Sequence, residues 1–240
     1  MHAPMSGDLV DELCKKLRSL PTAVISDVLA TMGLPDQVLC SSIRALGSLN
    51  GFAGPALCLC GSEGAEPPDL PNGSKLVFEM DRHVRRGCVT VIATGGHKIG
   101  AVIGGNVALS WHLRGCVGVV TDGGIRDAEE CQRLGLPVFA TFVGPMSNKG
   151  LWAVREIDVP VSLPGQRGAA VRVQPGDIIH ADSDGALVIP AMHLSQVVHD
   201  GEVLEQMEAK IRADLQRGDD REAVYARHNR FAHIKKLAPH

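Results

Sequence analysis

The stretch that most constrains the fold is residues 115–127, Gly-Cys-Val-Gly-Val-Val-Thr-Asp-Gly-Gly-Ile-Arg-Asp. Within it, residues 117–121 are uncharged and, apart from Gly118, β-branched, which is typical of a strand covered on both faces. Asp122 and two glycines then interrupt the apolar run. Residues 127–135 follow with helical spacing, an acidic first turn and a final glycine. A buried strand that runs through glycines into a helix predicts an α/β domain.

Arg126 and Asp127 stand at the exit of this predicted strand, where open α/β sheets usually bind ligands. The neighbouring glycines would let the backbone approach such a ligand closely. Asp127 is also well placed as the N-cap of the helix that follows, and Arg126 could simply pair with a neighbouring carboxylate. Spacing alone therefore leaves a binding site and a purely structural role both open.

Length and composition narrow the class of protein. The 240 residues can form one sizeable core, and we expect a single α/β domain over residues 1–218, tail helix included, with a C-terminal extension over residues 219–240. A net charge of −3 and only two Trp, one Tyr and five Phe argue against a nucleic-acid partner. The sequence has neither a secretory signal pattern nor a long uncharged apolar run, so we expect a cytoplasmic protein without a membrane partner.

The cysteines indicate reduced thiols rather than a metal site. The chain has seven, an odd number scattered through apolar stretches. Cys58 and Cys60 form the one close pair, but no His-x-His motif or second cysteine pair completes a zinc site.

Hydrophobic periodicity predicts the order of the elements. Helices are expected over residues 8–19, 22–33, 74–84, 107–114, 127–135 and 191–218. Strands are expected over residues 51–60, 85–93, 117–121 and 137–143, with four short antiparallel strands between residues 159 and 190. Thr22 or Ser26 would cap the second helix, and Gly33 would end it. We expect the basic end, residues 227–240, to be a solvated tail.

A glycine-rich segment forms a second candidate pocket wall. Residues 94–106 hold five glycines in thirteen positions, directly before a predicted helix. Free backbone amides at such a helix start can hold an anion. Glycine-rich loops also serve as plain connectors, so this segment is weak evidence by itself.

Taken together, an ordered set of motifs resembles the regulator of ribonuclease activity A-like superfamily, which includes class II pyruvate aldolases for 4-hydroxy-4-methyl-2-oxoglutarate and 4-carboxy-4-hydroxy-2-oxoadipate. The motifs are Val-Ile-Ser-Asp-Val-Leu at 24–29, Gly-Pro-Ala at 54–56, residues 114–127, Leu-Pro-Val-Phe-Ala at 136–140, and residues 173–177 with 182–190. The resemblance implies a compact, layered α/β domain with a mixed sheet, similar to the swivelling-domain fold, and a C-terminal helical tail. It also implies a homotrimer or a dimer of trimers with sites between subunits.

The resemblance further implies roles for the pocket residues. Asp127 would bind Mg²⁺ or Mn²⁺, largely through waters, and Arg126 would contact a small 2-keto acid and the developing enolate oxygen. The substrate carboxylate would lie on the backbone amides of Gly104, Gly105, Asn106 and Val107. A hard, oxygen-ligated cation polarises a 2-keto group and stabilises a pyruvate enolate. We therefore expect a metal-dependent carbon–carbon lyase, either an aldolase or a decarboxylase.

The chain departs from the family pattern at Gly105. Aldolases of this group carry an acidic residue at this position, twenty-one before the arginine, to handle a proton through a water. His97 stands where the family tends to have Asp, and it could relay protons as a catalytic base or simply be a solvent-facing loop residue. Glu205 or Glu208, on the tail helix of a neighbouring subunit, could also complete the site. The sequence does not decide among them.

Two other functional classes remain open. A non-catalytic binding protein, like the ribonuclease regulator that names the superfamily, would explain Gly105. A different lyase or hydrolase reaction on the same scaffold would use His97 as its base. The methyltransferase label that such sequences often carry has no support here, because no glycine-rich nucleotide fingerprint follows a first strand.

Overall fold

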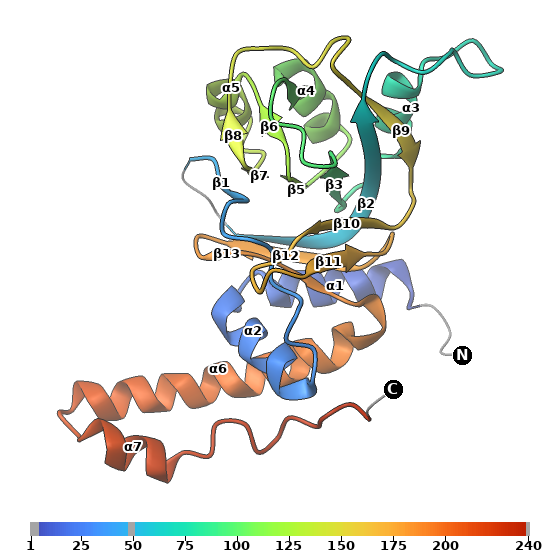
Figure 1. Ribbon diagram of the computed structural model, residues 1–240. Helices are drawn as coiled ribbons and strands as arrows, with labels where there is room; N and C mark the ends of the chain where they lie inside the picture. The colour runs from blue at the N-terminus through green and yellow to red at the C-terminus, as the bar shows by residue number, and fades with distance from the viewer. Residues whose placement is uncertain (1–4, 48–50, 239–240) are drawn as a thin grey trace.

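The fold is organised around a mixed β-sheet that carries two groups of helices, in a computed structural model that describes residues 5–47 and 51–238 (Figure 1). The strand order is β1-β7-β5-β3-β2-β12-β13, and β9 also pairs with β2. The strands are β1 (Arg44–Ala45), β2 (Phe52–Glu63), β3 (Val89–Ala93), β5 (Gly118–Thr121), β7 (Val138–Ala140), β9 (Trp152–Ile157), β12 (Ile178–Asp182) and β13 (Gly185–Ile189). The expected layered α/β fold with a mixed sheet is confirmed.

The long strand β2 joins the two halves of the molecule. Along one edge it pairs in parallel with β3, and the parallel ladder continues through β5 to β7. Along its other edge its first residues pair with β12 and its last residues pair with β9, both antiparallel. The central parallel strands are buried along their whole length, as their uncharged, β-branched sequences predict.

A small second sheet extends the parallel strands beyond their carboxyl ends. It contains β4 (Ala101–Ile103), β6 (Gly124–Ile125) and β8 (Phe142–Val143), which pair in parallel in that order. We had expected residues 101–103 to be part of a glycine-rich loop, and that expectation was wrong. This small sheet matters for function because it sets the ends of β4 and β6 side by side.

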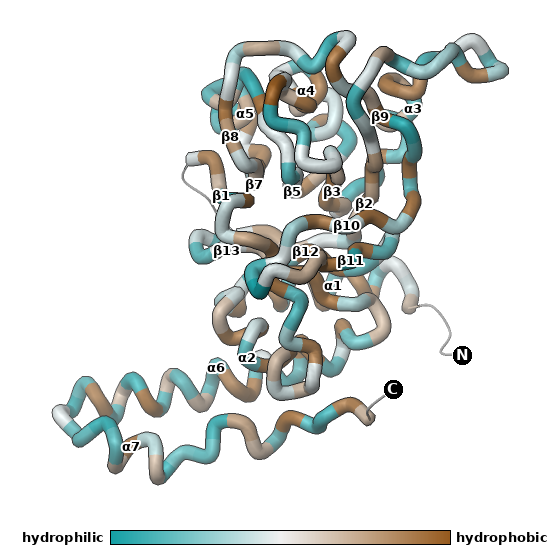
Figure 2. Tube along the Cα trace, in the orientation of Figure 1, coloured by the Kyte–Doolittle hydropathy of each residue, from teal (hydrophilic) through white to brown (hydrophobic). Residues whose placement is uncertain are grey.

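Two groups of helices pack at the two ends of one face of the main sheet, because the β2 residues that they contact, Ala53, Leu57 and Leu59, all lie on the same side of that strand. One group consists of α3 (Leu76–His83), α4 (Gly105–Leu113) and α5 (Ala128–Arg133), which pack around the fully buried Trp111. The other group consists of α1 (Gly7–Leu17), α2 (Thr22–Met32) and α6 (Leu194–Gln216), and it packs against β12 and β13. Figure 2 shows apolar and polar residues alternating along α6, as expected of a helix with one buried side. A hairpin of β10 (Val161–Pro164) and β11 (Ala170–Val173) covers a third cluster.

The start of α2 differs from the sequence prediction. Its N-cap is Pro21, and no side chain caps the helix. The Thr22 side chain instead donates to Asp182 Oδ1 at 2.6 Å, and the Thr22 amide donates to Asp182 Oδ2 at 2.8 Å. Thr22 therefore ties α2 to the end of β12. The predicted stop at Gly33 is confirmed, since this residue adopts the left-handed conformation with φ of 99°.

The C-terminal segment packs more closely than expected. After α6, the helix α7 (Arg221–Arg227) turns back, and the chain then runs along α6 (Figure 1). Ile234 is 7% exposed, and the Leu237 amide donates to the Met32 carbonyl at 2.9 Å. The expectation of a solvated tail is therefore wrong for these residues, because apolar side chains of the segment join the cluster beneath the sheet.

The seven cysteines are free thiols, and five of them are buried, as the sequence predicts. No helix in residues 5–47 or 51–238 is long and apolar enough to cross a membrane.

Candidate functional site

The site lies where two strands of the small sheet, β4 and β6, lead into the helices α4 and α5. Ile103 and Ile125 are register partners in the pair of β4 and β6. The next residues, Gly104 and Arg126, therefore emerge side by side, and the Arg126 amide donates to the Ile103 carbonyl at 3.0 Å. Because α4 begins at Gly105 and α5 begins at Ala128, two helix N-termini meet at this junction.

Asp127 occupies the N-cap position of α5, but its side chain does not cap that helix. The residue has φ of 58° and ψ of 37°, a left-handed conformation that costs a non-glycine residue roughly 1–2 kcal/mol. This backbone turns the carboxylate toward the other helix, where Oδ2 accepts a hydrogen bond from the Gly105 amide at 2.9 Å. The sequence predicted that Asp127 caps α5. In the structure its carboxylate instead accepts a hydrogen bond from the first residue of α4.

Arg126 and Asp127 approach the backbone of α4 closely. The Arg126 Nε atom lies 3.7 Å from Asp127 Oδ2, and both side chains are nearly half exposed. A Cβ atom at Gly104 would lie 2.9 Å from each of these two atoms. Glycine at position 104 therefore lets the arginine and the carboxylate sit directly against the start of the helix.

The first turn of α4 is open to a ligand. No side chain caps the helix, and Gly104 in the N-cap position has extended backbone. Within the described part of the chain, the amides of Asn106 and Val107 have no acceptor, as is usual for the first residues of an uncapped helix. The Gly105 amide is already bonded to Asp127, so it is not free to hold the substrate carboxylate that the resemblance assigned to it.

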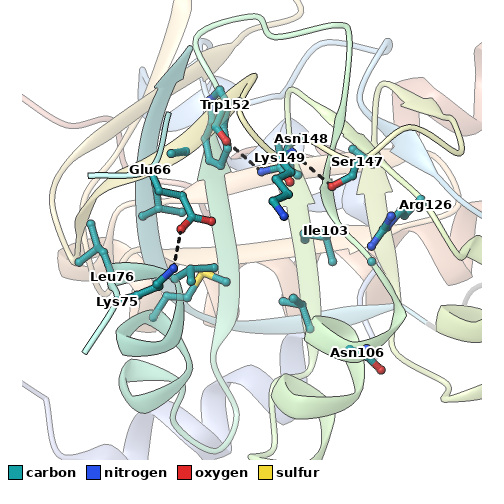
Figure 3. A pocket seen from close by; sticks show the side chains of 18 of the residues that line it. Glu66, Lys75, Leu76, Ile103, Asn106, Arg126, Ser147, Asn148, Lys149 and Trp152 are labelled. Atoms are coloured by element: carbon teal, nitrogen blue, oxygen red, sulfur yellow. Dashed lines mark hydrogen bonds and ion pairs between the residues drawn. The ribbon is translucent and has the colours of Figure 1, made fainter. Parts of the chain in front are cut away.

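A cavity of about 250 Å³ opens in front of this junction. Its floor is apolar and includes Met80, Ile103 and Trp152, whereas Arg126 and Lys149 bring positive charge to its walls (Figure 3). Lys75 also lines the cavity, but it lies 3.5 Å from Glu66 and is paired. Lys149 has no ion pair among the described residues. The cavity suits a small anionic molecule.

His97 does not reach this cavity. Its side chain is fully buried, its Nε2 accepts a hydrogen bond from the Gly100 amide at 3.0 Å, and its Nδ1 lies 3.4 Å from Glu63 Oε1. Both ring nitrogens are thus engaged in holding the loop of residues 94–100. His97 is therefore not the solvent-facing residue that the sequence allowed, and it does not line the cavity in which a base would act. The buried Asp122 shapes the same loop by accepting from the Thr94 and Gly96 amides.

The two tail-helix carboxylates have different surroundings. Glu208 is paired with Arg230. Glu205 bonds Arg212 through Oε1, while its buried Oε2 has no partner within the described residues. Both glutamates lie on α6, and neither lines the cavity of its own chain. Only a second copy of the chain could bring one of them to the cavity.

Glu130 is the acidic residue at the junction that the sequence analysis missed. Its carboxylate fills the space beside Gly105, where a Cβ atom would have its three nearest neighbours all in the Glu130 carboxyl group. The available signal was its position three residues after Asp127, which places the two acidic residues on one side of the first turn of α5. Sequence spacing within α5 could not show which other helix this side faces.

The carboxylate oxygens of Asp127 suit a hard cation that keeps most of its water ligands. The carboxylate is 45% exposed, and only Oδ2 takes part in the bond from Gly105. No group of three or more His, Cys, Asp or Glu side chains that could enclose a metal occurs within residues 5–47 and 51–238. Mg²⁺ is commonly held in this way, by one or two carboxylates with water and substrate oxygens.

Comparison with known proteins identifies the family. The family model RraA-like, described as Aldolase/RraA, matches residues 22–188. The chain belongs to this family. It is 32% identical over 202 residues to an uncharacterised protein of Methanocaldococcus jannaschii, with 74% of this chain and 91% of that protein covered. It is 35% identical over 159 residues to a Cupriavidus necator protein named "Putative 4-hydroxy-4-methyl-2-oxoglutarate aldolase", covering 63% of this chain and 83% of that protein.

A solved structure of the same family confirms the fold of this RraA-like chain. The structure is Streptomyces coelicolor RraAS2, titled an unusual member of the RNase ES inhibitor RraA protein family. It superposes with a TM-score of 0.72 at 28% identity, covering 88% of this chain and 99% of that one. Relatives in the family thus carry both aldolase and ribonuclease-inhibitor names.

Proposed function

We propose that this RraA-like protein is a divalent-metal-dependent lyase that breaks a carbon–carbon bond of a small 2-keto acid to give a pyruvate enolate. The observation that carries the proposal is Asp127, which adopts a strained left-handed backbone and directs its carboxylate toward the start of α4, beside Arg126. Strained residues of this kind gather at functional sites. A helix cap would not need the strain, since Asp caps helices from ordinary extended backbone.

The chain's own groups can bind and orient the substrate. The free amides of Asn106 and Val107 suit the carboxylate next to the keto group, because the N-terminus of a helix carries partial positive charge. Arg126 is placed to donate to the keto oxygen, where negative charge develops as the enolate forms. When bound at Asp127, Mg²⁺ or Mn²⁺ would supply Lewis-acid polarisation of that oxygen.

The charge of the cavity lining favours a substrate with a second acidic group. Lys149 lines the cavity together with Arg126 and has no ion pair among the described residues (Figure 3). An ammonium group without an ion-pair partner would attract a second carboxylate of the substrate. A dicarboxylic 2-keto acid therefore suits the charge of the cavity better than pyruvate alone.

We further propose that the working unit is a trimer or a dimer of trimers. The far half of α6 and α7 project from the body as an arm (Figure 1). Glu205 and Glu208 are both paired within their own chain, with Arg212 and Arg230, so a site shared between subunits would require one of these ion pairs to open on assembly.

A non-catalytic regulator remains the second candidate, favoured by the likeness to RraAS2, which is named within a ribonuclease-inhibitor family. Enzyme assays separate the two. Purified protein is tested for pyruvate release from 4-hydroxy-4-methyl-2-oxoglutarate and from oxaloacetate, in EDTA and then with Mg²⁺ or Mn²⁺ restored. A lyase loses activity in EDTA and regains it with the cation. Full activity in EDTA would contradict the metal requirement, and inactivity in every condition would favour the regulator.

A further inference from the structure

The carboxylate of Glu130 occupies the side-chain space of a different residue. A Cβ atom built on Gly105 would approach Glu130 Oε2 to well under 3.0 Å, a distance that real Cβ atoms do not adopt. Glycine at position 105 therefore leaves room for an acidic group that arrives from α5. Any larger residue at 105 would have to push the Glu130 side chain away.

This arrangement places an unengaged carboxylate next to the cavity, against Gly105. Gly105 lines the cavity next to Asn106 and Val107, whose amides are free. Asp127 is engaged, because it accepts the Gly105 amide and lies beside Arg126. The carboxylate of Glu130 is half-buried and has no hydrogen bond or ion pair within the described residues. Of the two acidic groups at the α4 N-terminus, Glu130 is thus the one that can exchange bonds during a reaction.

The alternatives for a proton carrier are less well placed. His97 is fully buried and has both ring nitrogens engaged. Glu66 lies at the far wall and is paired with Lys75. A catalytic acid or base must lie within hydrogen-bond reach of the proton that it moves, directly or through one water. Glu130 does not itself line the cavity, but its carboxylate lies against Gly105, which does, so it can reach a substrate held on the first turn of α4 through one water.

We propose that Glu130 is the catalytic group that moves the proton in this lyase, an inference that rests on the proposed function. Its carboxylate takes the proton from the substrate hydroxyl through one water. The bond between the hydroxyl-bearing carbon and its neighbour breaks, the hydroxyl carbon becomes a carbonyl, and the electron pair passes into the enolate. Glu130 then returns the same proton to the enolate carbon and so forms the methyl group of pyruvate. No oxidant or further reactant is consumed.

Four variants test this role: Glu130→Gln, the control Glu129→Gln, Glu130→Ala, and the double variant Gly105→Asp with Glu130→Ala. Glu129 is a suitable control because it is an exposed acidic residue of the same helical turn. The double variant moves the carboxylate from α5 onto α4, into the space that Glu130→Ala vacates. Each protein is assayed with Mg²⁺ for cleavage of 4-hydroxy-4-methyl-2-oxoglutarate and for decarboxylation of oxaloacetate, and its thermal unfolding is recorded.

Glu130→Gln should lower kcat for cleavage by roughly 10²- to 10⁴-fold with little change in KM, whereas Glu129→Gln should match wild type. Decarboxylation should fall much less, because that reaction removes no hydroxyl proton, and its survival shows that the pocket is intact. The double variant should recover cleavage by at least about tenfold over Glu130→Ala.

Two results would overturn the inference. One is a Glu130→Gln variant that cleaves as fast as Glu129→Gln. The other is a parallel loss of cleavage, decarboxylation and thermal stability, which indicates a structural role. A failure of the proposed function looks different, because the wild-type protein would then neither cleave nor decarboxylate a 2-keto acid with Mg²⁺ present.

Discussion

Substitutions at Asp127 separate the strain of its backbone from the chemistry of its carboxylate. Asparagine tolerates the left-handed conformation and keeps an oxygen to accept the Gly105 amide, so Asp127→Asn should unfold within about 0.5 kcal/mol of wild type. The same variant should lose metal-dependent activity, because an amide oxygen holds a hard cation far less well than a carboxylate.

Alanine and glycine at position 127 separate the free energy of the hydrogen bond to Gly105 from the cost of the left-handed backbone. Asp127→Ala loses the bond to Gly105, worth about 1 kcal/mol for a carboxylate that is 45% exposed, and it keeps a Cβ atom in left-handed backbone at about 1–2 kcal/mol. Wild type already carries the cost of a Cβ atom in this backbone, so the expected loss of unfolding free energy relative to wild type is about 1 kcal/mol. Asp127→Gly loses the same bond but escapes the Cβ strain, so it should be about 1 kcal/mol more stable than Asp127→Ala.

Urea unfolding in EDTA measures these differences, with all variants at one protein concentration because assembly would add to the stability of each. The reasoning fails if Asp127→Gly is no more stable than Asp127→Ala. It also fails if Asp127→Asn keeps its metal-dependent activity.

Two further predictions concern assembly and acid stability. Light scattering at micromolar concentration should give at least three times the chain mass of 25.5 kDa, and a monomer mass would remove the shared-site proposal. Burial by itself raises the pKa of Asp182, but hydrogen bonds from the Thr22 hydroxyl and amide outweigh burial and hold this pKa below its usual range. A depressed folded-state pKa stabilises the protein above about pH 4 and loses this effect as pH falls further. Asp182→Asn should therefore lower the free energy of unfolding by about 1 kcal/mol at pH 7 and by almost nothing near pH 3. An equal loss at both pH values would contradict the link between this pKa and stability.

Local sequence patterns predicted the elements whose signals are local. The buried strand at residues 118–121 and the helix that Gly33 ends follow from apolar runs and from glycine at a left-handed position. The antiparallel strands between residues 161 and 189 follow from their turn residues. The strand Trp152–Ile157 was missed, because its pairing with the far end of β2 depends on a contact distant in sequence.

The candidate site could be predicted only in part. The sequence shows that Arg126 and Asp127 are adjacent. The direction of the Asp127 carboxylate depends on a left-handed backbone that no sequence pattern predicted. The space beside Gly105 is filled by Glu130 from another helix, and the loop of residues 94–100 draws His97 inward. Each of these outcomes is set by packing between segments that lie apart in the chain, which local periodicity does not encode.

Exchange of the methyl protons of pyruvate in D₂O tests the central claim most directly, because it reports enolate formation without any assumption about the second product. Proton NMR would follow the methyl signal with wild-type protein and Mg²⁺, with EDTA added, and with Asp127→Asn. The proposed site predicts exchange well above the protein-free rate that stops with EDTA and in the Asp127→Asn variant. Exchange at the protein-free rate under every condition would contradict it.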